Sequence, residues 1–217
     1  MSREYRLDLH PTANPQAVVA GQTYRFTVLT DRLIRMEYQE EGRFVDEPTQ
    51  RCLCREFPLP EFRVLENADS LEIITDKLHL YYDKKPFTRE GLTVFLKEGY
   101  HPHGSAWAYG DEIQDLKGTA RTLDEANGAI PLEPGLMSRF GFTVMDDSSS
   151  AFIDPDQWPR AKDRKSIDLY FFGYGHDYLG CLKDFYRLSG PTPLLPRLPL
   201  ATGGVATIDT RKKAIWR

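Results

Sequence analysis

The chain has 217 residues, of which 41% are hydrophobic and 28% charged, and its formal net charge at pH 7 is −4. This length allows one large domain or two small ones, and the acidic balance offers no basic patch of the kind that binds nucleic acid. No apolar run is long enough for a secretory signal or a membrane span, so we expect a cytoplasmic protein with no membrane partner.

Short segments of alternating polarity dominate the first two-thirds of the chain. Tyr24–Leu29 and Leu33–Tyr38 alternate and are separated by a tight corner at Thr30–Arg32. Further candidate strands follow at similar spacing: Phe62–Leu65, Leu71–Thr75, Leu78–Tyr82 and Leu92–Leu96. Short alternating strands joined by polar turns predict a mainly β protein, an antiparallel β-sandwich rather than a chain of βαβ units. About ten to fourteen strands of ordinary length would fit.

Cys52 and Cys54 form a pair that could be half of a metal site. A structural zinc site needs four ligands, and no second pair of Cys or His residues at ligand spacing completes this one. We therefore interpret the two cysteines as neighbours on one face of a strand and expect no metal. With Cys181 the chain has three cysteines, an odd number without framework spacing, which favours a reducing compartment.

The region Tyr100–Ser138 interrupts the alternation with glycines and polar clusters. A loop this long within a compact domain is uncommon and is usually functional or disordered. Its aromatic and ionic residues argue against simple disorder. His101 and His103 could present two imidazoles on one side of an extended segment, but a metal site needs three or four ligands.

Arg121 and Asp124, in the loop segment GTARTLD, are the strongest candidates for a binding site. A guanidinium and a carboxylate suit sugar hydroxyls, and nearby Trp107 and Tyr109 offer aromatic faces, the combination from which sugar sites are usually built. The alternative is that Arg121 and Asp124 form an ion pair that merely fixes the loop. From the residues alone, both interpretations stay open.

Strands resume after the loop at Phe140–Met145, Ala151–Ile153 and Ile167–Tyr174. Asp146 and Asp147, between the first two, could form a pair of catalytic carboxylates. Adjacent residues on a strand point to opposite faces, however, so we predict a polar hairpin turn at this position.

His176–Leu188 is predicted to be an amphipathic helix. His176 or Asp177 can cap its start, and Gly190 with Pro191 ends it. The apolar residues of its predicted buried face recur at helical spacing: Tyr178, Cys181, Leu182, Phe185 and Leu188. The preceding GYG turn lacks the full GxGxxG pattern of a dinucleotide site, so no cofactor is expected.

Three segments together resemble glycoside hydrolase family 31, in particular its bacterial α-glucosidase and α-xylosidase branch. They are VLTDRLIRMEYQEEGRFVDEPTQ at Val28–Gln50, KGTARTLDEANGAIPLEPGLMSRFGFTVMDDS at Lys117–Ser148, and DLYFFGYGHDYLGCLKDFYRLSGPTPLLPR at Asp168–Arg197. The third segment is the most specific. The resemblance implies a galactose mutarotase-like β-sandwich over residues 1–175, followed by a helix and connector at 176–197 toward a catalytic (β/α)8 barrel.

The same resemblance implies a retaining α-glycosidase, whose two carboxylates stand about 5 Å apart. In the family both belong to the barrel, which this chain is expected to lack, so no catalytic residue is assigned. The family's N-terminal domain contributes a loop that closes over the bound sugar. By this resemblance Asp124 is the first candidate for substrate contact and Arg121 the second, with an α-glucoside or α-xyloside as ligand.

Residues 198–217 do not continue the family's pattern, which at the barrel entry reads PRFALGNWWSRY. Back-translation of Leu198–Thr210 with suitable codons, read one base earlier, can give FALGNWWSRYHRY. We therefore expect 198–217 to be an out-of-frame tail. A sandwich that evolved against a barrel should also expose an apolar patch, on the helix face and at Pro191–Pro196.

These observations predict the N-terminal fragment of a retaining α-glycosidase, inactive alone, that binds carbohydrate and supports the barrel. A non-enzymatic carbohydrate-binding or interaction module is the alternative. A free-standing sugar mutarotase is a third possibility, but it needs a positioned His acid and Glu base, and no segment indicates that pair.

Overall fold

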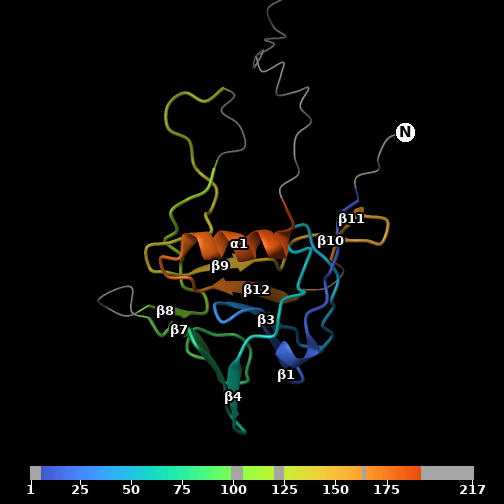
Figure 1. Cartoon of the computed structure of the whole chain (residues 1–217), viewed down its shortest axis with the longest axis vertical. Helices are drawn as coiled ribbons and strands as arrows, with labels where there is room; N and C mark the ends of the chain where they lie inside the picture. The colour runs from blue at the N-terminus through green and yellow to red at the C-terminus, as the bar shows by residue number, and fades with distance from the viewer. Residues whose placement is uncertain (1–5, 99–104, 120–124, 163–164, 192–217) are drawn as a thin grey trace, which may run out of the picture.

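A computed structural model describes residues 6–98, 105–119, 125–162 and 165–191 (Figure 1). The described chain is mainly β, with two five-stranded antiparallel sheets, a two-stranded sheet and one α-helix. The helix-side sheet has the order β1-β2-β3-β12-β9, and the outer sheet has the order β4-β5-β6-β7-β8. The helix-side strands are β1 (Val18–Ala20), β2 (Tyr24–Val28), β3 (Leu33–Tyr38), β12 (Ile167–Phe172) and β9 (Thr143–Asp146). The outer strands are β4 (Phe62–Glu66), β5 (Leu71–Thr75), β6 (Leu78–Tyr82), β7 (Leu92–Leu96) and β8 (Ala106–Ala108).

The two five-stranded sheets pack face to face around one hydrophobic core. Phe26 and Phe171 enter it from the helix-side sheet, and Ile73, Leu80 and Trp107 enter it from the outer sheet. All five are at most 2% exposed. Strands β5, β6 and β7 of the outer sheet alternate strictly between buried and accessible positions, as expected for a sheet with one face on the core. The predicted antiparallel β-sandwich is therefore confirmed.

The helix α1 (Tyr178–Ser189) lies on the opposite face of the helix-side sheet (Figure 1). Its Cys181 and Leu188 are buried in a second cluster with Leu33, Tyr170 and Phe172. Asp177 caps the helix by accepting a 3.0 Å hydrogen bond from the backbone N–H of Gly180. These contacts confirm the predicted helix and its buried face, and they identify Asp177 rather than His176 as the N-terminal cap.

The short elements are where the sequence analysis fell short. It missed β1, β8, the 3₁₀ turn Pro15–Ala17 and β11 (Pro159–Arg160), which pairs with β10 (Phe152–Ile153). Strand β8 lies within the predicted loop, at the edge of the outer sheet, where Trp107 faces Val94 across the ladder. Two or three residues carry too little alternation to identify a strand.

The interpretation of Cys52 and Cys54 as neighbours on a strand is wrong. Neither belongs to a strand, and Cys54 makes an isolated bridge to His10. Cys52 is fully buried in the cluster beneath α1, and this burial raises its pKa to about 12. Both thiols are free, and that of Cys52 is held in its protonated form.

No helix of the described residues is long and apolar enough to cross a bilayer.

Phe171 tests the sandwich core. It is fully buried, and its ring centroid lies 5.8 Å from that of Trp107 and 5.7 Å from that of Phe142. We expect Phe171→Ala to lower the free energy of unfolding by about 3–5 kcal/mol, because it leaves a cavity between the sheets. Urea denaturation measures this. Phe95→Ala is the matched control, since Phe95 is 45% exposed on the outer sheet, and equal losses in both variants would contradict this core.

Candidate functional site

The long loop has an ordered stem. The backbone N–H of Leu116 donates to the carbonyl of Met137 over 2.7 Å, and the N–H of Gly118 donates to the carbonyl of Glu133 over 2.7 Å. Gly135 is required here, because a β-carbon at this position would lie 2.6 Å from the carbonyl oxygen of Lys117. The loop is thus a hairpin that stands off the sandwich on the side of α1 (Figure 1).

Arg121 and Asp124, the predicted sugar contacts, lie outside the described residues, as do His101 and His103. The stem ends at Thr119 on one side and resumes at Glu125 on the other. The stem is therefore the described part of the predicted binding loop, and the roles of Arg121 and Asp124 stay a prediction.

The expectation that Trp107 and Tyr109 offer aromatic faces to a sugar is wrong for Trp107. Trp107 is 2% exposed and belongs to the sandwich core. Tyr109 packs partly buried against that core, its ring 5.6 Å from Phe87, and burial raises its pKa. The reason is β8, whose pairing with β7 turns the indole inward.

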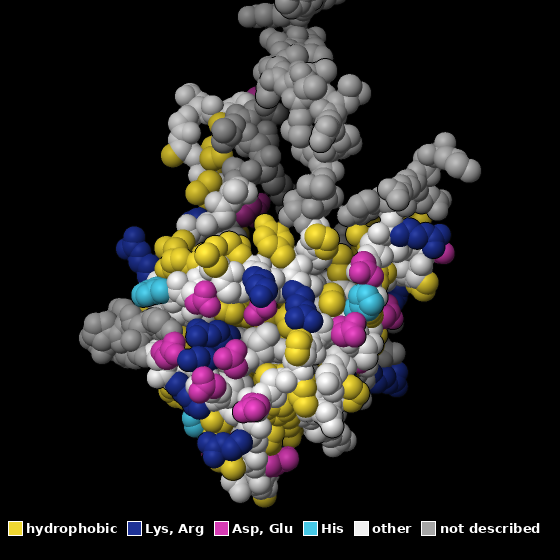
Figure 2. All heavy atoms as spheres, in the orientation of Figure 1, with side chains coloured by type: hydrophobic (Ala, Val, Ile, Leu, Met, Phe, Trp, Pro, Cys, Tyr) yellow, Lys and Arg dark blue, Asp and Glu magenta, His cyan; other side chains and the backbone are white. Residues whose placement is uncertain are grey.

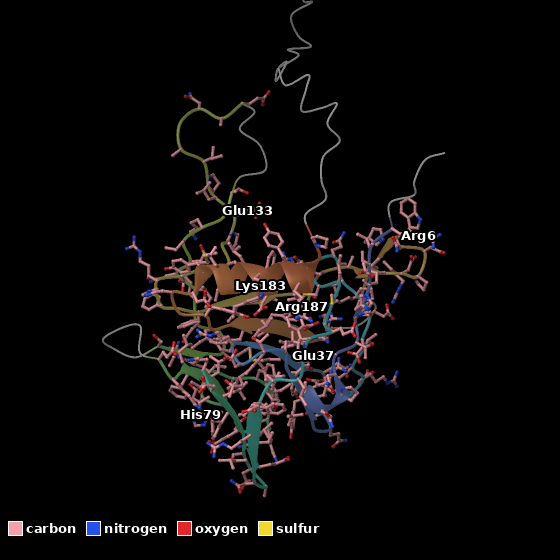
Figure 3. All side chains as sticks on the ribbon, viewed as in Figure 1. Arg6, Glu37, His79, Glu133, Lys183 and Arg187 are labelled. Atoms are coloured by element: carbon pink, nitrogen blue, oxygen red, sulfur yellow. The ribbon has the colours of Figure 1, made fainter. Side chains whose placement is uncertain are left out.

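A charged layer covers the part of the helix-side sheet that α1 leaves free. Asp168 on β12 accepts two hydrogen bonds from Arg35 on β3, from Nε over 2.9 Å and from Nη2 over 2.8 Å. Glu37 accepts two from Arg25 on β2, over 2.6 and 2.9 Å, and lies 3.0 Å from Nη2 of Arg35. Figure 3 shows Glu37 at this sheet, beneath the level of α1. Two guanidinium groups and two carboxylates are therefore paired within one layer.

Further groups close this layer from above. Asp46 accepts hydrogen bonds from Nη1 and Nη2 of Arg25 over 3.1 and 2.8 Å. Lys162, with 8% of its side chain exposed, donates to the backbone carbonyl of Asp147 over 2.7 Å and lies 3.9 Å from Asp168. Burial alone would raise the pKa of Asp168, but Arg35 lowers it to about 2. Asp168 is thus an anion in the folded protein at neutral pH.

The cavity in this layer is too small for a sugar. Its volume is about 40 Å³, and it is lined by Arg35, Glu37, Phe44, Lys162 and Asp168 among others. This is room for a water molecule or two. Because the charged groups that line it already pair with each other, we assign the layer a structural role.

Asp146 and Asp147 do not form a pair of catalytic carboxylates. Asp146 ends β9 in solvent and accepts a hydrogen bond from the N–H of Ser148, in the predicted turn. Asp147 is fully buried and accepts a 2.7 Å hydrogen bond from the hydroxyl of Thr49, while its Oδ1 has no partner in the described structure. Burial and the nearby charge of Asp168 raise the pKa of Asp147. No local sequence signal distinguishes the two aspartates, because the burial of Asp147 comes from Thr49, 98 residues away.

Large apolar side chains are exposed on α1 and on the neighbouring hairpin. Leu179 is 80% exposed and Tyr186 47% exposed on the outward face of α1, and Leu116 and Leu132 on the hairpin are 46% and 48% exposed. Figure 2 shows hydrophobic side chains gathered along this side of the molecule. The hairpin base and the start of α1 line one shallow cavity, with Leu136, Met137, Tyr178 and Cys181 in its wall. We name the four exposed residues Leu116, Leu132, Leu179 and Tyr186 the hairpin-and-helix face.

Among the described residues, no group of three or more His, Cys, Asp and Glu side chains could hold a metal ion.

No protein-family model matches the chain, and neither does any curated protein. Solved structures of glycoside hydrolase family 31 are similar to it at low identity. A dextranase of Flavobacterium johnsoniae, complexed with glucose, is 11% identical with a TM-score of 0.45, over 82% of this chain and 27% of the dextranase. A mutant of that enzyme complexed with isomaltotriose gives the same values. An α-xylosidase of Xanthomonas citri is 18% identical with a TM-score of 0.28, over 38% of this chain and 9% of the xylosidase.

The chain therefore spans about a quarter of the length of the dextranase.

Asp168 tests the charged layer. Its lowered pKa means that the folded state binds the proton less tightly than the unfolded chain, so its stabilisation is present above pH ~4 and is lost as the pH falls toward 2. Asp168→Asn should cost about 3 kcal/mol or more at pH 7, because it leaves Arg35 buried with too little negative charge. Urea denaturation at pH 7 and pH 3 measures this, with exposed Asp156→Asn as control. A loss that is the same at both pH values would contradict the proposed pairing.

Asp147 should behave in the opposite way. Its raised pKa means that the folded state holds the proton more tightly, so this carboxyl reduces stability as the pH rises above ~4. An amide in its place still accepts from Thr49 and carries no charge. Asp147→Asn should therefore be at least as stable as the wild type at pH 7, with the difference shrinking at pH 3. A loss of about 2 kcal/mol or more at pH 7 would show that the charge is needed.

Proposed function

We propose that this chain is the N-terminal β-sandwich and connector of a retaining α-glycosidase of family 31, of the α-glucosidase or α-xylosidase type. The three sequence segments that resemble this family support the proposal, and they run through the elements that define the fold. Val28–Gln50 contains β3, Lys117–Ser148 contains β9 and all of the hairpin stem but Leu116, and Asp168–Arg197 contains α1 and all of β12 but Ile167. The resemblance therefore includes strands and the helix that form the fold, and is not confined to surface loops.

The observation that carries the proposal is the hairpin-and-helix face. A monomeric domain rarely leaves large apolar side chains exposed together, and such patches usually mark an interface. Here Leu179 and Tyr186 lie on the outward side of α1, beside a hairpin that stands off the sandwich. A catalytic barrel that follows the connector would cover α1, and the hairpin would reach past it toward the bound sugar.

The chemistry divides between the two parts in this proposal. The barrel supplies the nucleophile and the acid–base carboxyl, about 5 Å apart, and the sandwich supplies the binding loop. Asp124 would accept hydrogen bonds from sugar hydroxyls, and Arg121 would donate to them. The close fit of Gly135 against Lys117 would hold the stem of that loop in place.

Sequencing of the gene beyond codon 197 tests the proposal most directly. We expect a shifted frame to encode a barrel that begins with a segment like FALGNWWSRY. A locus with no barrel in any frame downstream would overturn the proposal.

The purified chain of residues 1–217 should not hydrolyse nitrophenyl α-glucoside or α-xyloside, because the proposed division of chemistry assigns the nucleophile and the acid–base carboxyl to the barrel and neither to the sandwich. A continuous assay at several pH values, compared with a mock preparation, measures this. Turnover above the mock would contradict the division of chemistry.

The hairpin-and-helix face should make the isolated chain self-associate, because its apolar side chains are exposed to solvent. Sedimentation velocity over a range of concentrations should show dimers or larger species. The double variant Leu179→Lys with Tyr186→Lys should reduce them, whereas Leu65→Lys, which changes an exposed leucine of β4, should not. A wild-type chain that stays monomeric at high concentration would argue against a large interface on this face.

A further inference from the structure

The solvent face of the outer sheet carries an ordered array of side chains that the proposed function does not use. Ladder registers define two neighbouring rows across strands β4 to β7. The first row contains Leu65, Glu72, Tyr81 and Thr93, and the second contains Arg63, Ile74, His79 and Phe95. All eight are half-buried or exposed, whereas the residues between them along each strand from β5 to β7 face the core.

Three large apolar side chains stand out in these two rows. Leu65 is 51% exposed, Phe95 45% and Tyr81 37%. The solvent side of an antiparallel sheet is normally polar, so three such residues within four strands require an explanation. Figure 3 shows His79, from the second row, on the side of the molecule away from α1. The array is thus separate from the hairpin-and-helix face.

Polar and apolar side chains alternate in both directions of the array. Leu65 faces Glu72 across the ladder, Ile74 faces His79, and His79 faces Phe95. Glu72 and His79 hydrogen-bond to each other over 2.7 Å, and the imidazole of His79 lies 6.3 Å from the ring of Phe95. Tyr81 and Phe95 are diagonal neighbours, close enough to form one surface.

This alternation decides what kind of molecule fits. A protein interface gathers its apolar residues at the centre and its polar residues at the rim. A pyranose chain instead presents apolar C–H faces interleaved with hydroxyl groups at every ring. Aromatic side chains stack on the apolar C–H faces of the sugar rings. The Glu72–His79 pair offers a hydrogen-bond donor and an acceptor to the hydroxyl groups. Strand spacing makes the array about 14 Å wide, enough for more than one sugar ring.

We propose that this array is a binding surface for a neutral polysaccharide, with Tyr81 and Phe95 stacking on sugar rings and Glu72 and His79 binding their hydroxyls. The inference does not rest on the proposed function. It concerns the opposite face of the sandwich and needs no barrel.

Native gels cast with a soluble polysaccharide test the surface in the chain as it exists. Soluble starch, dextran and xyloglucan serve as separate probes, with a gel free of polysaccharide as reference. We expect at least one of them to retard the wild type. Each ring that stacks should contribute about three- to tenfold in affinity, so Tyr81→Ala and Phe95→Ala should each weaken retardation and the double variant should abolish it.

The controls separate stacking from loss of structure. Tyr81→Phe keeps the ring and should keep most of the retardation, whereas Glu72→Gln should weaken it without changing the fold. Trp158→Ala removes a 71% exposed aromatic residue outside the array and should have no effect. Thermal unfolding of every variant, expected within a few degrees of the wild type, confirms that the sandwich is intact.

Two outcomes would overturn the inference. One is a wild type that none of the three polysaccharides retards. The other is self-association of the chain that Tyr81→Ala or Phe95→Ala removes, which would identify the occupant as a second copy. Neither outcome depends on the gene sequence beyond codon 197, so failure of the polysaccharide-binding inference leaves the proposed function untouched. Likewise, the absence of a barrel downstream would leave this inference untouched.

Discussion

The double hydrogen bond between Arg35 and Asp168 is the interaction on which the rest of the structure depends. It joins two strands whose residues lie 133 positions apart and lies where only 3% and 6% of the two side chains reach solvent. A slip of one residue between β3 and β12 would turn Phe171 out of the core and Tyr170 into it. Because a buried guanidinium requires its carboxylate, the pair penalises every other register and so helps to specify this one.

The position of the helix follows from this register. Tyr170 and Phe172 face the same side of β12 as Asp168, so the outer surface of the sheet changes from charged to apolar within four residues. The apolar end accepts Cys181 and Leu188 of α1, while residues 43–46 and Lys162 cover the charged end. The hairpin in turn rests on the start of α1, where Leu136 and Met137 meet Tyr178. The ion pair thus contributes, through the register of β12, to the position of the face proposed to meet the barrel.

The strands and the helix whose residues show a local periodicity could be predicted from the sequence. Alternation located β2 to β7, β9, β10 and β12, and helical spacing with Asp177 and Gly190 located α1. Features that depend on distant partners were out of reach: Asp147 is buried by Thr49, and Trp107 is turned inward by a three-residue edge strand. The charged layer was missed for the same reason, since Arg25, Arg35 and Glu37 look like solvent-facing residues of alternating strands until the covering segment is in place.

Alternation along the outer sheet places one set of side chains in the core and the other set on the solvent face. Strands β5 to β7 place every second residue in the core, and this half of the pattern accounts for the fold. The other half is free of that constraint, because the exposed parts of Leu65, Tyr81 and Phe95 contribute no burial to the core. Their arrangement among Glu72 and His79 therefore has to be explained by something outside the chain. A ligand with interleaved apolar and hydroxyl groups supplies that explanation without any change to the core beneath it.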